Sequence, residues 1–301
     1  MAQVKTYRPS IKEVQEGGGA WSKLERAVLA ATKTGDRAVL QGKENTPQDE
    51  TDPDRRVRAT LIRYLMLGGC GDATNGARPH PIGVDICGGW VDGILDLENC
   101  DSPLDLMLQS CLLAHRATLR DARLGGVYLR GCHAPQGLDL HRLTTIRSVH
   151  LRDGFKATGM VDLGAAQIGG QLTCSDGQFL AKGTALNCNA ATIGASVFLR
   201  DGVRTNGRVD FVRATITGSV YVCRKDGNPT HIDGIFTLQR ATMCRVARGT
   251  THTHTLMGFS QYNGRRWMAS IGKTSPGNGQ RLTCAGRGLG RCMTIGTVGM
   301  G

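Results

Sequence analysis

The sequence predicts a mainly β fold: a right-handed β-solenoid with about 23–25 residues per coil and a short N-terminal helical cap. Two recurring apolar-x-apolar triplets predict this fold. The first begins at Leu138, Val161, Leu186 and Val209, and the second at Val149, Leu172, Val197 and Val220. Such triplets are typical of short strands with one buried face. Because one coil cannot make a core, these strands bury their apolar faces only when coils stack.

Turn signals recur in the same register as the triplets. Asp-Gly, which favours a turn with positive φ, begins at residues 153, 176, 201 and 226, and Ala-x-Ile begins at 166, 191 and 214. Residues 80–243 therefore predict about seven coils, each rising ~4.8 Å. A leucine-rich-repeat horseshoe has a similar period, but its longer consensus is absent.

The N-terminal segment, residues 1–79, predicts a helical cap and a linker. Residues 1–20 are polar and indicate a loose start. Apolar residues at helical spacing predict a helix over about Ser22 to Lys33. After a polar linker, the Asp-Pro start signal predicts a second helix over about Pro53 to Met66. We expect the two helices to cover the edge of the first coil.

A five-residue period precedes the longer repeat. Ala117-Thr-Leu119, Ala122-Arg-Leu124, Val127-Tyr-Leu129 and Cys132-His-Ala134 each place two small or apolar residues two positions apart. Both residues of each pair are predicted to point inward. Small inward side chains keep the tube narrow, which agrees with an aromatic content of only 5%.

Cysteine usage predicts buried thiols. The chain has 11 cysteines, an odd number, and no Cys-x-x-Cys, so a disulfide framework or a zinc finger is not expected. Cys111, Cys132, Cys174 and Cys188 fall in inward slots of the triplets. We expect them to be small buried hydrophobes in a reducing compartment.

The last segment, residues 244–301, departs from the repeat. It has eight Lys or Arg residues and no acidic residue, and it therefore supplies most of the net charge of +12 of the whole chain. One hypothesis is a basic, irregular tail; another is a shift of the reading frame near residue 244. A basic tail would bind an anionic membrane surface or nucleic acid. The nearly neutral segment 80–243 does not favour nucleic acid.

Three segments resemble a known family. These are Met160 to Cys174, Arg208 to Val222, and the predicted helix at Val57 to Leu65. They are similar to bacterial proteins with pentapeptide-repeat-like β-helices, often labelled "membrane-associated oxidoreductase". The resemblance covers about residues 20–243. It implies the β-helical fold and, by label, a redox activity, but it transfers no catalytic residue.

The sequence contains no motif that fits a known cofactor site. Gly17-Gly18-Gly19 follows no predicted strand, and Gly286-x-Gly288-x-Gly290 precedes no predicted helix, so neither fits a dinucleotide site. No phosphate-loop motif occurs, and we expect neither a cofactor nor a metal ion. Polysaccharide lyases on β-helices need long loops beside a carboxylate cluster, and the loops here are short.

Two outward columns are the candidate interaction residues. The first comprises the middle residues of the first triplet, Asp139, Asp162, Asn187 and Asp210, and the second comprises those of the second triplet, His150, Thr173, Phe198 and Tyr221. A carboxylate column would bind a cation or a basic partner; the alternative is a solvated turn face. The aromatic column would bind a partner or a sugar; the alternative is stacking between coils.

The function predicted from these observations is a non-catalytic β-solenoid scaffold that binds a protein partner of unknown identity. The alternatives are a membrane-associated oxidoreductase and a basic tail that binds an anionic membrane. The start of the chain has no apolar signal-peptide region and no apolar run approaches ~20 residues. We therefore expect a cytoplasmic protein. The family resemblance implies a bacterial source and, as an alternative, peripheral contact with the inner membrane.

Overall fold

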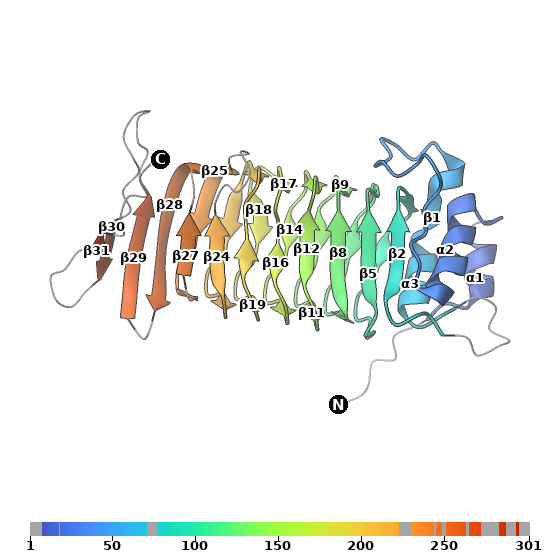
Figure 1. Cartoon of the computed structure of the whole chain (residues 1–301), viewed down its shortest axis with the longest axis horizontal. Helices are drawn as coiled ribbons and strands as arrows, with labels where there is room; N and C mark the ends of the chain where they lie inside the picture. Colours follow the sequence, from blue (N-terminus) through green and yellow to red (C-terminus); the bar gives the residue numbers. More distant parts are fainter. Residues whose placement is uncertain are drawn as a thin grey trace.

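The parallel strands of the chain stack along one axis, and the helices lie at one end of the stack (Figure 1). The computed structural model describes residues 8–17, 19–70, 78–222 and 230–243 with their side chains, and the backbone of strands between residues 245 and 294. The described strands form a parallel β-solenoid of about 7 turns. Among the described residues, no helix is both long enough and apolar enough to cross a bilayer.

Three helices form the N-terminal cap: α1 (Ile11–Glu16), α2 (Lys23–Thr34) and α3 (Ala59–Met66). The prediction of α2 is confirmed, and Ser22 caps it. The prediction of a loose start is wrong for α1. Ser10 and Glu13 form a reciprocal capping box there, and that signal was present in the sequence.

The second predicted helix begins six residues later than its start signal. Asp52 caps only a short 3-10 helix, η1 (Pro53–Arg55). The next residues form strand β1 (Arg56–Arg58), which pairs in parallel with β3 (Trp90–Asp92) before α3 begins. A distant strand partner therefore overrides the local helix signal.

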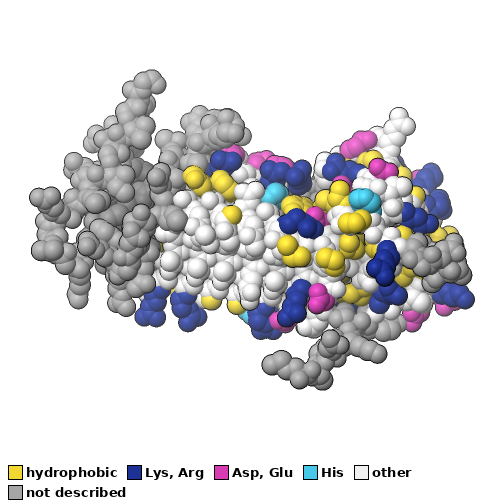
Figure 2. All heavy atoms as spheres, turned by 60° about the horizontal axis from the view of Figure 1, so that its bottom comes forward, with side chains coloured by type: hydrophobic (Ala, Val, Ile, Leu, Met, Phe, Trp, Pro, Cys, Tyr) yellow, Lys and Arg dark blue, Asp and Glu magenta, His cyan; other side chains and the backbone are white. Residues whose placement is uncertain are grey.

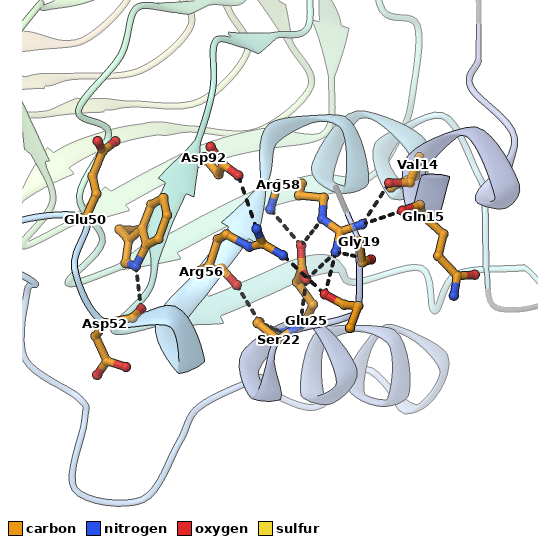
Figure 3. Close-up of polar contacts among 12 residues, drawn as sticks. Val14, Gln15, Gly19, Ser22, Glu25, Glu50, Asp52, Arg56, Arg58 and Asp92 are labelled. Atoms are coloured by element: carbon orange, nitrogen blue, oxygen red, sulfur yellow. Dashed lines mark hydrogen bonds and ion pairs between the residues drawn. The ribbon is translucent and has the colours of Figure 1, made fainter. Parts of the chain in front are cut away.

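A buried ion pair between Glu25 and Arg58 holds the cap together (Figure 3). The Glu25 side chain is 0% exposed and lies 3.1 Å from Arg58 Nε. It also accepts hydrogen bonds from the backbone N–H of Ser22, at 2.8 Å, and of Arg58, at 3.0 Å. The Arg58 guanidinium donates further to the carbonyls of Val14 and Ala20, each at 2.8 Å. These contacts join α1, α2 and β1, which precede the solenoid.

Each coil has four sides, and the first side forms one continuous sheet, which we call the front sheet. Its strands are β2 (Gly83–Cys87), β5 (Asp105–Gln109), β8 (Gly126–Arg130), β12 (Val149–Arg152), β16 (Leu172–Thr173), β20 (Val197–Phe198), β24 (Ser219–Val222) and β27 (Arg245–Arg248). The front sheet is the row of arrows facing the viewer in Figure 1.

The other three sides are shorter strands in the same parallel arrangement. The second side contains β9 (His133–Ala134), β13 (Lys156–Ala157), β17 (Gln178–Phe179), β21 (Arg204–Thr205) and the start of β25 (Thr230–Thr237). The third contains β4 (Leu95–Asp96), β6 (Ala117–Thr118), β10 (Leu138–Asp139), β14 (Val161–Asp162), β18 (Thr184–Asn187), β22 (Arg208–Asp210) and the end of β25. The fourth contains β7 (Arg123–Leu124), β11 (Thr144–Thr145), β15 (Gln167–Ile168), β19 (Thr192–Ile193), β23 (Thr215–Ile216) and β26 (Ala241–Thr242).

The five-residue period corresponds to the four sides of one coil. Its four segments are β6, β7, β8 and β9 with their flanking residues. Both inward residues of every segment are buried, and none of them is more than 2% exposed. The prediction for these residues is confirmed, and the four predicted inward cysteines are also buried and free. Apolar burial along the whole tube gives one continuous core.

The Asp-Gly turns have the predicted backbone. Asp153, Asp176 and Asp201 all have φ between 55° and 61°, in the left-handed region that Asp tolerates better than most residues. A second corner repeats this conformation once per coil, at Asn99, Asp121, Arg142, Ala165, Ala190, Arg213 and Arg240. The turn at residue 226 lies outside the described residues.

Strand backbone continues into the segment that the sequence predicts to be irregular. β27 pairs in parallel with β24, and β28 (Thr251–Tyr262) pairs in parallel with β25. Antiparallel pairs then join β28 to β29 (Arg265–Ile271), β29 to β30 (Thr283–Gly286), and β30 to β31 (Met293–Thr294). The side chains of residues 244–301 lie outside the described residues, so both hypotheses about the tail stay predictions.

Candidate binding face

The second predicted column lies on the outer surface of the front sheet. Parallel pairing places His150 beside Thr173, Thr173 beside Phe198, and Phe198 beside Tyr221. The same column extends toward the helices through Tyr128, Met107 and Asp85. Apolar-x-apolar triplets that begin at residues 84, 106 and 127 could have predicted this extension. The predicted column started only at His150 and therefore missed these three residues.

Stacking between coils accounts for the aromatic end of the column. The rings of Phe198 and Tyr221 stack with centroids 4.9 Å apart and planes 7° apart. The Arg200 guanidinium lies 4.6 Å from the Phe198 ring centroid. A second ring and a cation therefore cover Phe198, which leaves little of its face for a sugar. Thr173, only 6% exposed, is buried within the same column.

His150 is a neutral, half-buried side chain in the middle of the column. Its ring meets the Tyr128 ring edge-on, with centroids 4.9 Å apart. Burial, together with the nearby Arg152 and Arg130 cations, lowers the pKa of His150 to about 4. The imidazole is consequently uncharged near neutral pH.

A shallow depression of about 150 Å³ lies at the helical end of this column. It is lined by Arg37, Asp85, Asp105, Met107, Leu108, Gln109, Tyr128 and Arg130. Figure 2 shows hydrophobic side chains gathered toward the helical end of the solenoid, with Lys and Arg side chains between them. The depression combines a Met and an aromatic side chain with charged groups around them.

Two ion pairs hold the carboxylates of this depression in place. Arg37 Nε lies 3.0 Å from Asp85 Oδ1, and Arg147 donates from Nη2 to Asp105 Oδ1 at 2.6 Å and from Nε at 2.9 Å. Each carboxylate is mostly covered, at 13% and 12% exposed. Arginines thus neutralise both acids, and the depression presents these paired charges and the Arg130 cation beside Met107, Leu108 and Tyr128.

The first predicted column, on the third side, is also brought into line. Pairing joins Asp139 to Asp162, Asp162 to Asn187, and Asn187 to Asp210. Each side-chain oxygen accepts a hydrogen bond from the backbone N–H two residues later: His141 at 3.2 Å, Gly164 at 2.8 Å, Asn189 at 3.0 Å and Val212 at 2.8 Å. These bonds give the column a structural role in the turns.

Arginines neutralise the most buried of these carboxylates. Arg116 and Arg120 both lie within 3.0 Å of Asp139 Oδ2. Burial by itself would raise the pKa of Asp139, but hydrogen bonds from Arg120 and from the backbone of His141 outweigh burial and lower it. Among the residues with described side chains, no group of three His, Cys, Asp or Glu could hold a metal ion.

Residues around the depression were missed at the sequence level. Arg37, Asp105 and Arg147 stand outside the repeated triplets, and their ion pairs join residues 48 and 42 positions apart.

Comparison with known proteins found no relative: no family model, no curated protein and no solved structure matches the chain.

Proposed function

We propose that this chain is a rigid β-solenoid scaffold whose front sheet binds a protein partner. The observation that carries the proposal is the depression beside Met107 and Tyr128, in a face whose side chains are held at fixed intervals by strand pairing. Protein interfaces are enriched in Tyr, Met and Arg, and anchoring side chains fill such pockets. A cavity of about 150 Å³ accommodates one benzene-sized group, so the depression fits a single partner side chain.

Site-specific photo-crosslinking tests this proposal. A photoreactive phenylalanine analogue replaces Gln109 at the rim of the depression, or Thr192, an exposed residue on the fourth side, as the matched control. We expect a discrete protein adduct from position 109 in native extract and none from position 192. Met107→Arg fills the depression and is expected to abolish that adduct. Equal labelling from both positions, or adducts that survive Met107→Arg, would contradict the proposal.

The same preparation separates the scaffold from its alternatives. A flavin or nicotinamide absorbance band would favour the oxidoreductase that the family resemblance implies. Salt-sensitive retention on anionic phospholipid vesicles would favour a peripheral membrane protein. We expect neither result from a scaffold that binds a protein.

A further inference from the structure

Two buried thiols occupy equivalent positions in consecutive coils. Leu112 pairs in parallel with His133, and Cys111 and Cys132 directly precede them. The His133 N–H donates to the carbonyl of Cys111 at 2.9 Å. Cys111 Sγ donates to the Ile86 carbonyl at 3.6 Å, and Cys132 Sγ donates to that of Leu108 at 3.2 Å. Since Ile86 and Leu108 are themselves paired neighbours, each thiol makes the same contact one coil apart.

At this position two consecutive coils have a cysteine, and the coils on either side have a different residue. Toward the helices, the position equivalent to Cys111 is Gly89, because Trp90 pairs with Leu112 and Gly89 precedes Trp90 as Cys111 precedes Leu112. Away from the helices, the next inward residue at this corner is Phe155, fully buried, which precedes the strand paired with β9. Cys111 and Cys132 are 1% and 0% exposed. They are enclosed between a glycine and an aromatic ring.

The separation of the two residues suits a covalent bond. Neighbouring strands lie ~4.8 Å apart, within the roughly 4.4–6.8 Å that Cα atoms of a disulfide span. The two cysteines occupy matching buried positions in adjacent coils. The Cys132 thiol and the N–H groups of Gly89 and Gly88 lower the pKa of Cys111, whereas burial raises that of Cys132. We therefore assign Cys111 as the nucleophile and Cys132 as the resolving thiol.

We propose that Cys111 and Cys132 form a disulfide, generated by a peroxide, that joins two consecutive coils covalently. The Cys111 thiolate attacks one oxygen of hydrogen peroxide, forming a sulfenic acid and releasing hydroxide. The Cys132 sulfur then attacks the sulfenic sulfur, the S–S bond forms, and the hydroxyl leaves as water with the Cys132 proton. The two sulfurs lose two electrons in total, and the peroxide oxygens gain them.

Peptide mapping of the full chain tests the disulfide. The folded protein is treated with stoichiometric hydrogen peroxide, quenched, unfolded in an alkylating reagent and digested with trypsin. Cleavage sites separate the two cysteines at Arg116, Arg120, Arg123 and Arg130. Because the peptide that ends at Arg116 also holds Cys70, Cys87 and Cys100, fragment-ion sequencing identifies which of its cysteines carries the bond. We expect one cross-linked species that joins the Cys111 and Cys132 peptides, lighter than their sum by two hydrogen atoms, and lost on reduction.

Matched variants assign the bond. Cys132→Ala is expected to stop the oxidation of Cys111 at sulfenic or sulfinic acid, whereas Cys100→Ala, at another buried cysteine, is expected to keep the cross-link. If Cys132→Ala fails to fold, the map of the unaltered chain decides alone. Both thiols recovered in alkylated form, or a cross-link spread over other cysteines, would overturn the proposal.

Discussion

Arg147 reaches across an intervening coil to hold Asp105, with Nη2 2.6 Å and Nε 2.9 Å from Oδ1. The coil between them contributes Gly125, whose N–H donates to Leu104 and whose carbonyl accepts from Arg147. A Cβ on Gly125 would clash with the Arg147 guanidinium and with the carbonyl of Pro103. Because Gly125 has no side chain, Arg147 can pass over its coil and reach Asp105 in the coil beyond.

Gly125→Ala is accordingly expected to destabilise the protein by about 1–3 kcal/mol, as overpacking usually does. Urea unfolding followed by circular dichroism measures the change. Gly183→Ala serves as the control, since a Cβ there meets no atom within 4 Å, and its effect is expected to stay within about 0.5 kcal/mol. Equal effects at the two glycines would show that Arg147 does not need this space.

Arg58→Met is expected to cost about 3–5 kcal/mol, because it leaves the Glu25 carboxylate buried without its cation. The free energy of unfolding in urea is the measured quantity. Lys23→Met provides the comparison. Its ammonium pairs with Asp54 at 2.8 Å, but the Lys23 side chain is 63% exposed, so we expect a loss of less than about 1 kcal/mol. Similar losses of unfolding free energy in both variants would contradict a stabilising role for the buried ion pair between Glu25 and Arg58.

His150 is expected to make stability depend on pH. Its pKa of about 4 in the folded chain lies below the ordinary value of 6.5, so the unfolded chain takes up a proton first as the pH falls. The contribution to stability is complete above about pH 6.5 and declines as the pH falls toward about 4. The midpoint of urea unfolding, followed across this range, should fall less in His150→Phe than in the unaltered chain. Parallel curves would argue against this role for His150.

Asp210 tests whether the carboxylate column serves the turns. Asp210→Asn keeps an oxygen for the Val212 N–H, as Asn187 does for Asn189, and we expect a change within about 0.5 kcal/mol. Asp210→Ala removes the acceptor and is expected to cost about 1–3 kcal/mol. Thermal and urea unfolding compare the two. If the Asn variant loses as much as the Ala variant, charge rather than turn geometry keeps the carboxylate.

The repeat could be predicted from the sequence because the apolar triplets recur every 23–25 residues and their inward and outward residues alternate. The recurrence predicted that Asp139 lies beside Asp162 and His150 beside Thr173, as the strand pairing shows. The capping box of Ser10 and Glu13 was equally local and could have revealed α1.

The features missed at the sequence level depend on distant partners. Arg56 joins β1 because Trp90 lies beside it, and no local signal competes with the helix start at Asp52. Asp105, which lines the depression, is held by Arg147, and the space for that contact comes from Gly125 in another coil. Contacts of this kind are properties of the stacked coils and not of any one repeat.

Stacked repeats usually behave as a chain of nearest neighbours, in which each unit opens next to its own boundary. The contact between Arg147 and Asp105 couples units that are not adjacent. The coils between Asp105 and Arg147 should consequently exchange their amide hydrogens as a single cooperative block, whereas coils nearer Val222 should open one by one. A single glycine thus sets how many coils at the helical end of this rod must unfold together.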